Sequence, residues 1–229
     1  MWRFLALIIA VSLLTLSSCV TGGSGEEKEI VSVERERAAM ELLSLDLFSS
    51  LSSFSIDSEI LEEALPSSFL LYEEYLPSFD DLENKYLTDV ADVAVEAVKN
   101  YMPVIKESAL ELAKDPLDYI EGDTTFSNAL RSKVGEELSS VIYSTLQDKS
   151  SDLEESFLGV SKIFGEIRKG YASLESVGKG EYLPEADSIL FNSVSIIVSD
   201  EFFNQLGREE KILKNTPVSS DSPYSVFWE

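Results

Sequence analysis

Apolar residues recur at steps of three and four along most of this 229-residue chain, a spacing typical of amphipathic helices. The repeat is regular at residues 126–146, where one face carries Phe126, Leu130, Val134, Leu138, Val141, Thr145 and Leu146. Asp123 or Thr124 is expected to cap this helix, because a side-chain oxygen there accepts from free backbone N–H groups. We find no ladder of alternating residues that indicates strands. The pattern predicts an all-α fold, a multi-helix bundle with short connecting loops.

Serine and proline residues divide the N-terminal third into shorter pieces. A first helix is expected at residues 30–48, followed by a break in the serine-rich residues 49–58. Two short helices are expected at 59–64 and 69–76, because each ends before a proline, and the residue preceding proline disfavours helical geometry.

Two long helices are predicted beyond these pieces. One opens near Ser78 or Asp80 and reaches Asp115, and Pro103 is expected to kink it or end it. Its apolar face comprises Tyr86, Val90, Val93, Ala97, Ile105, Ala109 and Leu112. The other opens at Pro184, a residue suited to a first helical turn, and runs to Lys214. Its buried side is expected to comprise Ile189, Leu190, Val194, Ile197, Val198, Phe202 and Leu206.

The clearest periodicity lies between these two helices and alternates steps of four and three. It consists of Leu153, Phe157, Val160, Phe164, Ile167, Tyr171 and Leu174. Such a seam favours antiparallel packing against a neighbouring helix in the core. A docking groove for a partner or a lipid is the alternative.

The N-terminus has the layout of a bacterial lipoprotein signal. An apolar run from Phe4 to Leu16 follows Arg3, and it is shorter than the about 20 residues of a membrane span. It ends in Leu16-Ser17-Ser18-Cys19, which resembles a lipobox. Ordinary secretory cleavage after Ser18 fits less well, because Leu16 would occupy position −3 of the cleavage site, where a small residue is required. We therefore predict a lipoprotein signal peptide at 1–18 and a lipid on Cys19.

The anchor defines the predicted organisation of the mature chain. Residues 19–29 form a glycine- and serine-containing tether, 30–217 the helical domain and 218–229 a C-terminal tail. A diacylglyceryl group supplies two acyl chains, which anchor a protein durably, at about 0.8 kcal/mol per buried methylene. Val20, rather than Asp, after the cysteine indicates the outer membrane in enteric-type sorting. The expected location is the bacterial cell envelope, facing the periplasm.

Composition excludes several functions. The formal charge is −24, so nucleic acid is a poor partner. The acidic surface suits a basic partner or cations, and the simpler interpretation is a solvated face. The chain has no histidine and a single cysteine, Cys19, which removes histidine-based catalysis, His- or Cys-ligated zinc and intramolecular disulfides. We expect neither enzymatic activity nor a cofactor.

Acidic residues gather around one glycine, Gly122. Asp115, Asp118, Glu121 and Asp123 flank it and supply the carboxylate oxygens that a calcium loop requires. Their spacing is not that of an EF-hand. The simpler interpretation is a helix end, a glycine turn and an aspartate cap.

The tail ends in aromatic residues, Tyr224, Phe227 and Trp228. We expect them to dock on the domain. Contact with a partner or a bilayer is the alternative.

From Ala91 to about Lys214 the sequence resembles a bacterial envelope family of unknown function, the one numbered 4197. The resemblance rests on residues 94–97 (AVEA), 103–109 (PVIKESA), 118–126 (DYIEGDTTF) with Leu130-Arg131, and 207–215 (GREEKILKN). It implies an all-helical envelope protein and supplies no catalytic residue. The expected function is therefore a non-enzymatic lipoprotein that binds a partner or serves the envelope structurally. A carrier of an apolar ligand in a helical cavity is the alternative.

Overall fold

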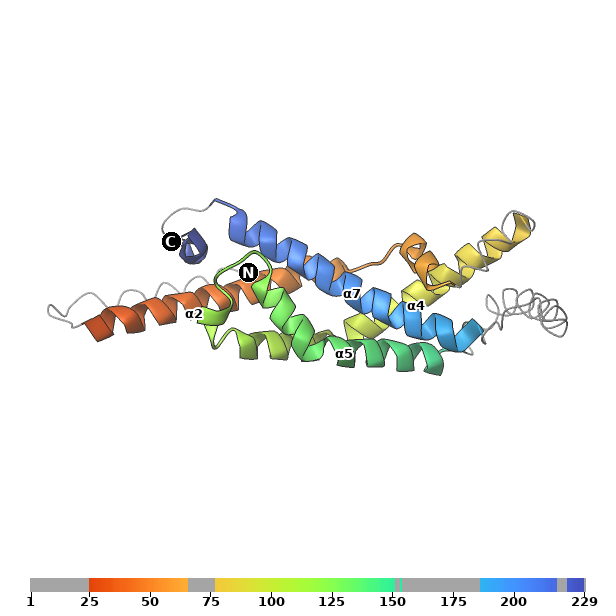
Figure 1. Ribbon diagram of the computed structural model, residues 1–229, viewed down its shortest axis with the longest axis horizontal. Coiled ribbons are helices and arrows are strands. Elements are labelled where there is room, and N and C mark those ends of the chain that lie inside the picture. Colours follow the sequence, from red (N-terminus) through yellow and green to blue (C-terminus); the bar gives the residue numbers. More distant parts are fainter. Residues whose placement is uncertain (1–24, 66–76, 151–152, 154–185, 218–221, 229) are drawn as a thin grey trace, which may run out of the picture.

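The computed structural model describes residues 25–65, 77–150, 153, 186–217 and 222–228, and these parts contain helices and no strand. Four long helices form an elongated bundle (Figure 1): α2 (Gly25–Ser50), α4 (Pro77–Leu112), α5 (Thr125–Asp148) and α7 (Ala186–Asn215). The predicted all-α bundle is confirmed.

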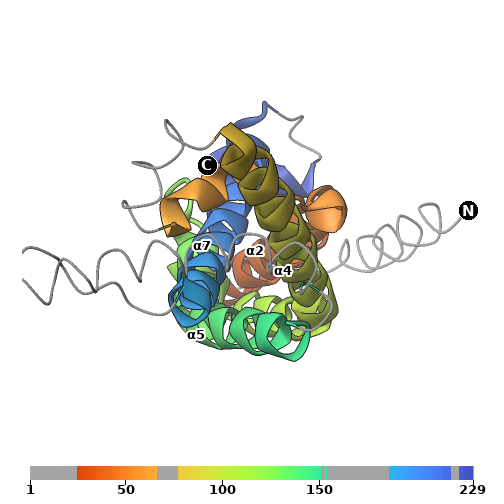
Figure 2. The same ribbon diagram turned by 90° about the vertical axis from the view of Figure 1, so that its right-hand side faces the viewer.

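Helix α5 packs against both α4 and α7, and the end view shows the long helices grouped around a shared interior (Figure 2). Four short 3-10 helices complete the described part: η1 (Leu51–Ser53), η2 (Ser58–Ala64), η3 (Pro116–Asp118) and η4 (Pro223–Trp228). Of these, η2 packs against α4 and α7, while η3 and η4 pack against α2. Helix α2 is thus held largely by connecting segments and by the C-terminal end of the chain.

The interior follows the predicted helix faces closely. On α5 a row at steps of four is buried, consisting of Phe126, Leu130, Val134, Leu138, Ile142 and Leu146, while Val141 and Thr145 are half-buried. On α4 the predicted positions Tyr86, Val90, Ala97, Ile105 and Ala109 are all buried. These faces form one continuous hydrophobic cluster with α2 and α7.

Small residues let α5 and α7 approach closely. A side chain added at Gly135 would begin 3.6 Å from the ring of Phe203. Ser199 donates to the Gly135 carbonyl oxygen at 3.3 Å, and Ser139 donates to Ser195 at the same distance. Larger residues at these points would push the two helices apart.

Two predicted boundaries are wrong. Helix α2 begins at Gly25, so residues 25–29 are not part of the tether. The sequence that follows Gly25 explains this, because Glu26, Glu27, Lys28 and Glu29 are good helix formers and acidic residues favour a helix start.

Of the two outcomes expected at Pro103, a kink or an end, the end is wrong, because α4 continues through this residue to Leu112. Proline removes one hydrogen bond to the carbonyl four residues earlier, that of Lys99. Lys99 and Pro103 are both exposed, so water can donate a hydrogen bond to the Lys99 carbonyl oxygen.

Several predictions fall outside the described residues. These are the signal peptide with Cys19, the short helix at 69–76, the seam at 153–174 beyond Leu153, and the helix start at Pro184. Leu153 is buried, as the seam requires.

Candidate functional site

The start of α5 carries the most elaborate polar structure in the described part of the chain. Gly122 turns the chain with a φ of +89°, a conformation that side chains disfavour, and an added Cβ would lie 3.0 Å from the Thr125 methyl group. The predicted glycine turn is confirmed. The predicted local cap is wrong, because Thr124 makes no side-chain capping bond and the Asp123 carboxylate accepts instead from Asn215, at 3.1 Å.

The cap comes from α7, 83 residues further along the sequence. Glu210 accepts from the backbone N–H of Phe126 at 3.1 Å and from that of Ser127 at 2.7 Å. The Ser127 hydroxyl donates to the same carboxylate. Glu210 is fully buried, so this carboxylate replaces water at the positive end of the α5 dipole.

Lys214, one turn further along α7, neutralises that carboxylate. Its Nζ lies 2.7 Å from Glu210 Oε1. It also donates to the carbonyl oxygens of Tyr119 at 2.6 Å and Gly122 at 3.0 Å, and to the Thr125 hydroxyl at 3.3 Å. The lysine is buried, and the ring centroid of Phe227 lies 5.5 Å from its Nζ.

We name this set of groups the charged junction: Glu210, Lys214, Ser127, Thr125 and the carbonyls of Tyr119 and Gly122. Both charges are buried and hydrogen-bonded, and neither is open to a substrate. The junction therefore joins α5, α7 and the 119–125 turn. The sequence pattern did not lead us to expect that Glu210 and Lys214 are buried.

The acidic residues around Gly122 do not converge. Asp123 pairs with Lys211 at 3.1 Å as well as with Asn215, and these two hydrogen bonds lower the pKa of Asp123. Among the residues that the structure describes, no group of three or more potential ligands is placed to hold a metal ion. This geometry favours the interpretation as a helix end and a glycine turn.

We expect metal chelation to leave the protein unchanged. EDTA should not shift the melting temperature, because the charged junction is stabilised by protein groups alone. Circular dichroism melts with and without EDTA test this. A fall of several degrees that calcium reverses would instead establish a calcium site around Gly122.

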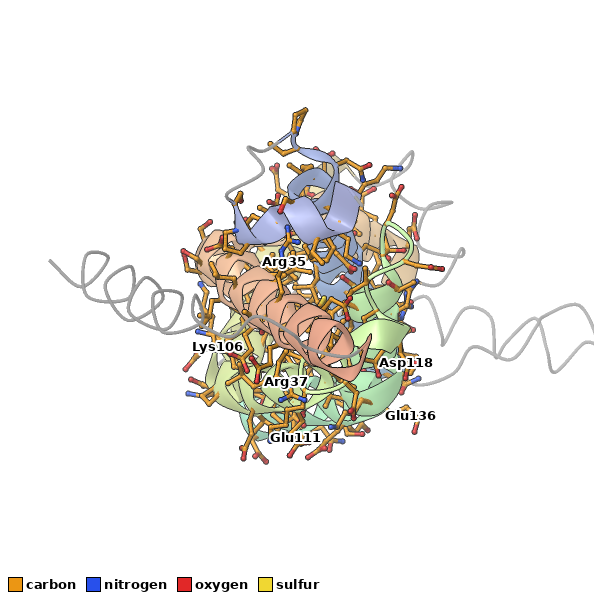
Figure 3. All side chains as sticks on the ribbon, turned by 90° about the vertical axis from the view of Figure 1, so that its left-hand side faces the viewer. Arg35, Arg37, Lys106, Glu111, Asp118 and Glu136 are labelled. Atoms are coloured by element: carbon orange, nitrogen blue, oxygen red, sulfur yellow. The ribbon has the colours of Figure 1, made fainter. Side chains whose placement is uncertain are left out.

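The C-terminal tail docks on α2, so the first and last helices of the described chain lie side by side (Figure 1). The Tyr224 hydroxyl donates to Asp46 at 2.5 Å, and Arg35 donates to the Ser225 hydroxyl at 2.6 Å. In Figure 3, Arg35 lies on the side of α2 next to η4. The predicted docking is confirmed for Tyr224 and Phe227, which pack against the core. The side chain of Trp228 lies outside the described residues.

Burial and then the hydrogen bond to Asp46 raise the pKa of Tyr224 well above its ordinary value. The tyrosine therefore stays protonated, and the hydrogen bond persists, throughout the neutral pH range. The folded-state pKa exceeds the unfolded one, so this contribution to stability is lost only in strongly alkaline solution.

Tyr224→Phe is expected to lower the free energy of unfolding by about 1.5 kcal/mol. This value is the lower end of the range for hydrogen bonds to charged groups, and we choose it because Asp46 is half-exposed. The matched control is Tyr143→Phe. The Tyr143 hydroxyl accepts from Gln147 at the surface, so its removal should change stability by less than about 0.5 kcal/mol. Urea denaturation measures both. Equal midpoints for the two variants would contradict the docked tail.

Two open surface depressions lie in the described part, a smaller polar one beside η1 and a larger one that exposes polar and apolar surface in about equal parts. A groove of about 520 Å³ between α5 and α7 is lined by Arg131, Ser132, Gly135, Glu136, Ser139, Asn192, Ile196, Ser199 and Asp200. Arg131 and Asp200 form an ion pair across it. Its lining contains no aromatic residue and one large aliphatic residue, Ile196, whereas pockets for apolar ligands are lined mainly by such residues.

Comparison of the chain with known protein families, curated proteins and solved structures finds no match. No helix in the described residues is long and apolar enough to cross a membrane.

Proposed function

We propose that this protein is a lipid-anchored lipoprotein of the bacterial envelope, without enzymatic activity, whose acidic helical domain binds a protein partner or serves the envelope structurally. The observation that carries the proposal is the Leu16-Ser17-Ser18-Cys19 sequence directly after a short apolar run, with no other cysteine in the chain. Attachment would place the domain outside the cytoplasm, at the outer membrane facing the periplasm. The resemblance to envelope family 4197 implies the same location, although no family model matches the chain.

The charge supports a basic partner. A formal charge of −24 attracts cationic protein surfaces and repels acidic ones, and this long-range attraction weakens as salt is added. The docked tail and the buried charged junction favour a firm scaffold over a catalytic domain.

A carrier of an apolar ligand receives less support. The described helices bury their apolar faces against one another, and most residues that line the groove between α5 and α7 are polar. If the protein is a carrier, the candidate residues that would line its cavity belong to the phenylalanine-bearing seam at residues 153–174.

Cys19→Ser should lose both fatty-acid labelling and membrane attachment. Metabolic labelling with palmitate followed by membrane fractionation measures the two effects together. The matched control is Ser18→Ala, which keeps a small residue before the cysteine and should be labelled like wild type. Undiminished membrane retention of Cys19→Ser would show that the apolar run itself is the anchor.

Partner binding is tested by crosslinking in the native envelope, followed by mass spectrometry of the captured proteins and lipids. The proposal predicts a basic protein whose recovery falls as salt is raised. Recovery of a stoichiometric lipid without a protein would favour the carrier function.

A further inference from the structure

The surroundings of the Lys214 ammonium group have the composition of a cation-binding site. Four oxygens converge on its Nζ: the carbonyls of Tyr119 and Gly122, the hydroxyl of Thr125, and the carboxylate of Glu210. The ring of Phe227 lies on the same ammonium group, at 5.5 Å from Nζ to the ring centroid. Oxygen acceptors and an aromatic face are the two kinds of group that recognise ammonium ions.

The acceptors are also held by contacts that do not involve the lysine. Thr125 donates its own hydroxyl hydrogen to the Tyr119 carbonyl at 2.9 Å, which leaves its oxygen lone pairs free to accept. Gly122 adopts its positive φ, which shapes the turn that carries both carbonyls. Glu210 is buried and fixed by the N–H groups of Phe126 and Ser127.

The spacing suits an ammonium ion better than calcium. The four nitrogen-to-oxygen distances are 2.6, 2.7, 3.0 and 3.3 Å. Three of them exceed the about 2.3–2.6 Å of calcium–oxygen bonds, and the site offers one carboxylate where calcium sites usually have several.

We infer that the 119–125 turn, together with Glu210 and Phe227, is a receptor site for a primary ammonium ion, which the chain fills with its own Lys214. The acidic sequence around Gly122 therefore does accompany a cation site, although the cation belongs to the protein and the exposed carboxylates take no part. Removing the lysine side chain should leave a site that accepts a free primary alkylammonium ion.

The test is chemical rescue of Lys214→Ala in the full chain, purified in a non-ionic detergent. The melting temperature of this variant should fall well below that of wild type. Propylammonium chloride, whose three carbons and one nitrogen match the heavy atoms deleted from Cγ to Nζ, should restore part of that loss in a saturable manner, as expected of a ligand that binds only the folded state.

Three controls separate this site from general salt or solvent effects. 1-Propanol supplies the chain without the charge, and tetramethylammonium chloride supplies the charge without N–H donors, so neither should rescue. Lys211→Ala removes an exposed lysine of the same helix and should not respond to propylammonium. Equal responses of Lys214→Ala and Lys211→Ala, or no response of Lys214→Ala, would overturn the inference.

If Lys214→Ala is unfolded without added ligand, helical circular dichroism provides the same readout. Recovery of helicity with propylammonium but not with 1-propanol would support the site. Failure to recover would overturn it. Neither result bears on the lipid anchor, which this experiment does not involve.

Discussion

Glu210→Ala is expected to lower the free energy of unfolding by about 3–5 kcal/mol, as does the loss of one partner from other buried ion pairs. The substitution leaves the Lys214 ammonium group buried beside two carbonyls with its counter-charge gone. It also removes the acceptor for the backbone N–H groups of Phe126 and Ser127. This loss is a large fraction of the about 5–15 kcal/mol that stabilises an ordinary domain.

Urea denaturation followed by circular dichroism measures the change. The matched control is Glu136→Ala, an exposed glutamate on α5, which should shift stability by less than about 0.5 kcal/mol. Equal stability of the two variants would show that Glu210 is not the cap of α5.

Phe202→Ala is expected to cost about 3–5 kcal/mol, the range for deleting a buried aromatic side chain. Phe202 is fully buried. Its ring meets those of Phe54 and Phe203 edge to face, with centroids 5.4 and 5.2 Å away. The cavity would separate the segment after η1 from α7 at the centre of the bundle.

Thermal and urea unfolding of Phe202→Ala can be compared with Ile196→Ala, an apolar residue of the same helix that is 47% exposed. The exposed variant should stay within about 0.5 kcal/mol of wild type. A small effect at Phe202 would mean that α7 does not bury this face.

The helix faces could be predicted from the sequence because burial follows the helical repeat. The row of α5 from Phe126 to Leu146 shows this, since every buried member of it is apolar and spaced by four residues. Turn chemistry was predictable for a similar reason, because only glycine readily adopts the conformation found at Gly122.

The charged junction could not be predicted in the same way, because capping rules consider only residues adjacent to the helix start. Glu210 reaches the start of α5 from another helix, and nothing near residue 125 indicates it. A weak signal was present in α7, where the buried row Leu190, Val194, Val198, Phe202 and Leu206 continues at the same step to Glu210 and Lys214. A glutamate and a lysine four residues apart on an otherwise apolar row could have indicated a buried pair.

The start of α2 was misplaced because two signals compete there. Gly22, Gly23 and Gly25 indicate a flexible tether, whereas the charged residues that follow them favour a helix. Helix α2 begins at the last of these glycines, Gly25, and includes the charged residues that follow it.

Mass spectrometry of the protein extracted from the membrane fraction tests the central claim most directly. Lipid anchoring predicts a mature chain that begins at Cys19 and carries a diacylglyceryl group on its sulfur. A chain that retains residues 1–18, or one that begins at an unmodified Cys19, would contradict it.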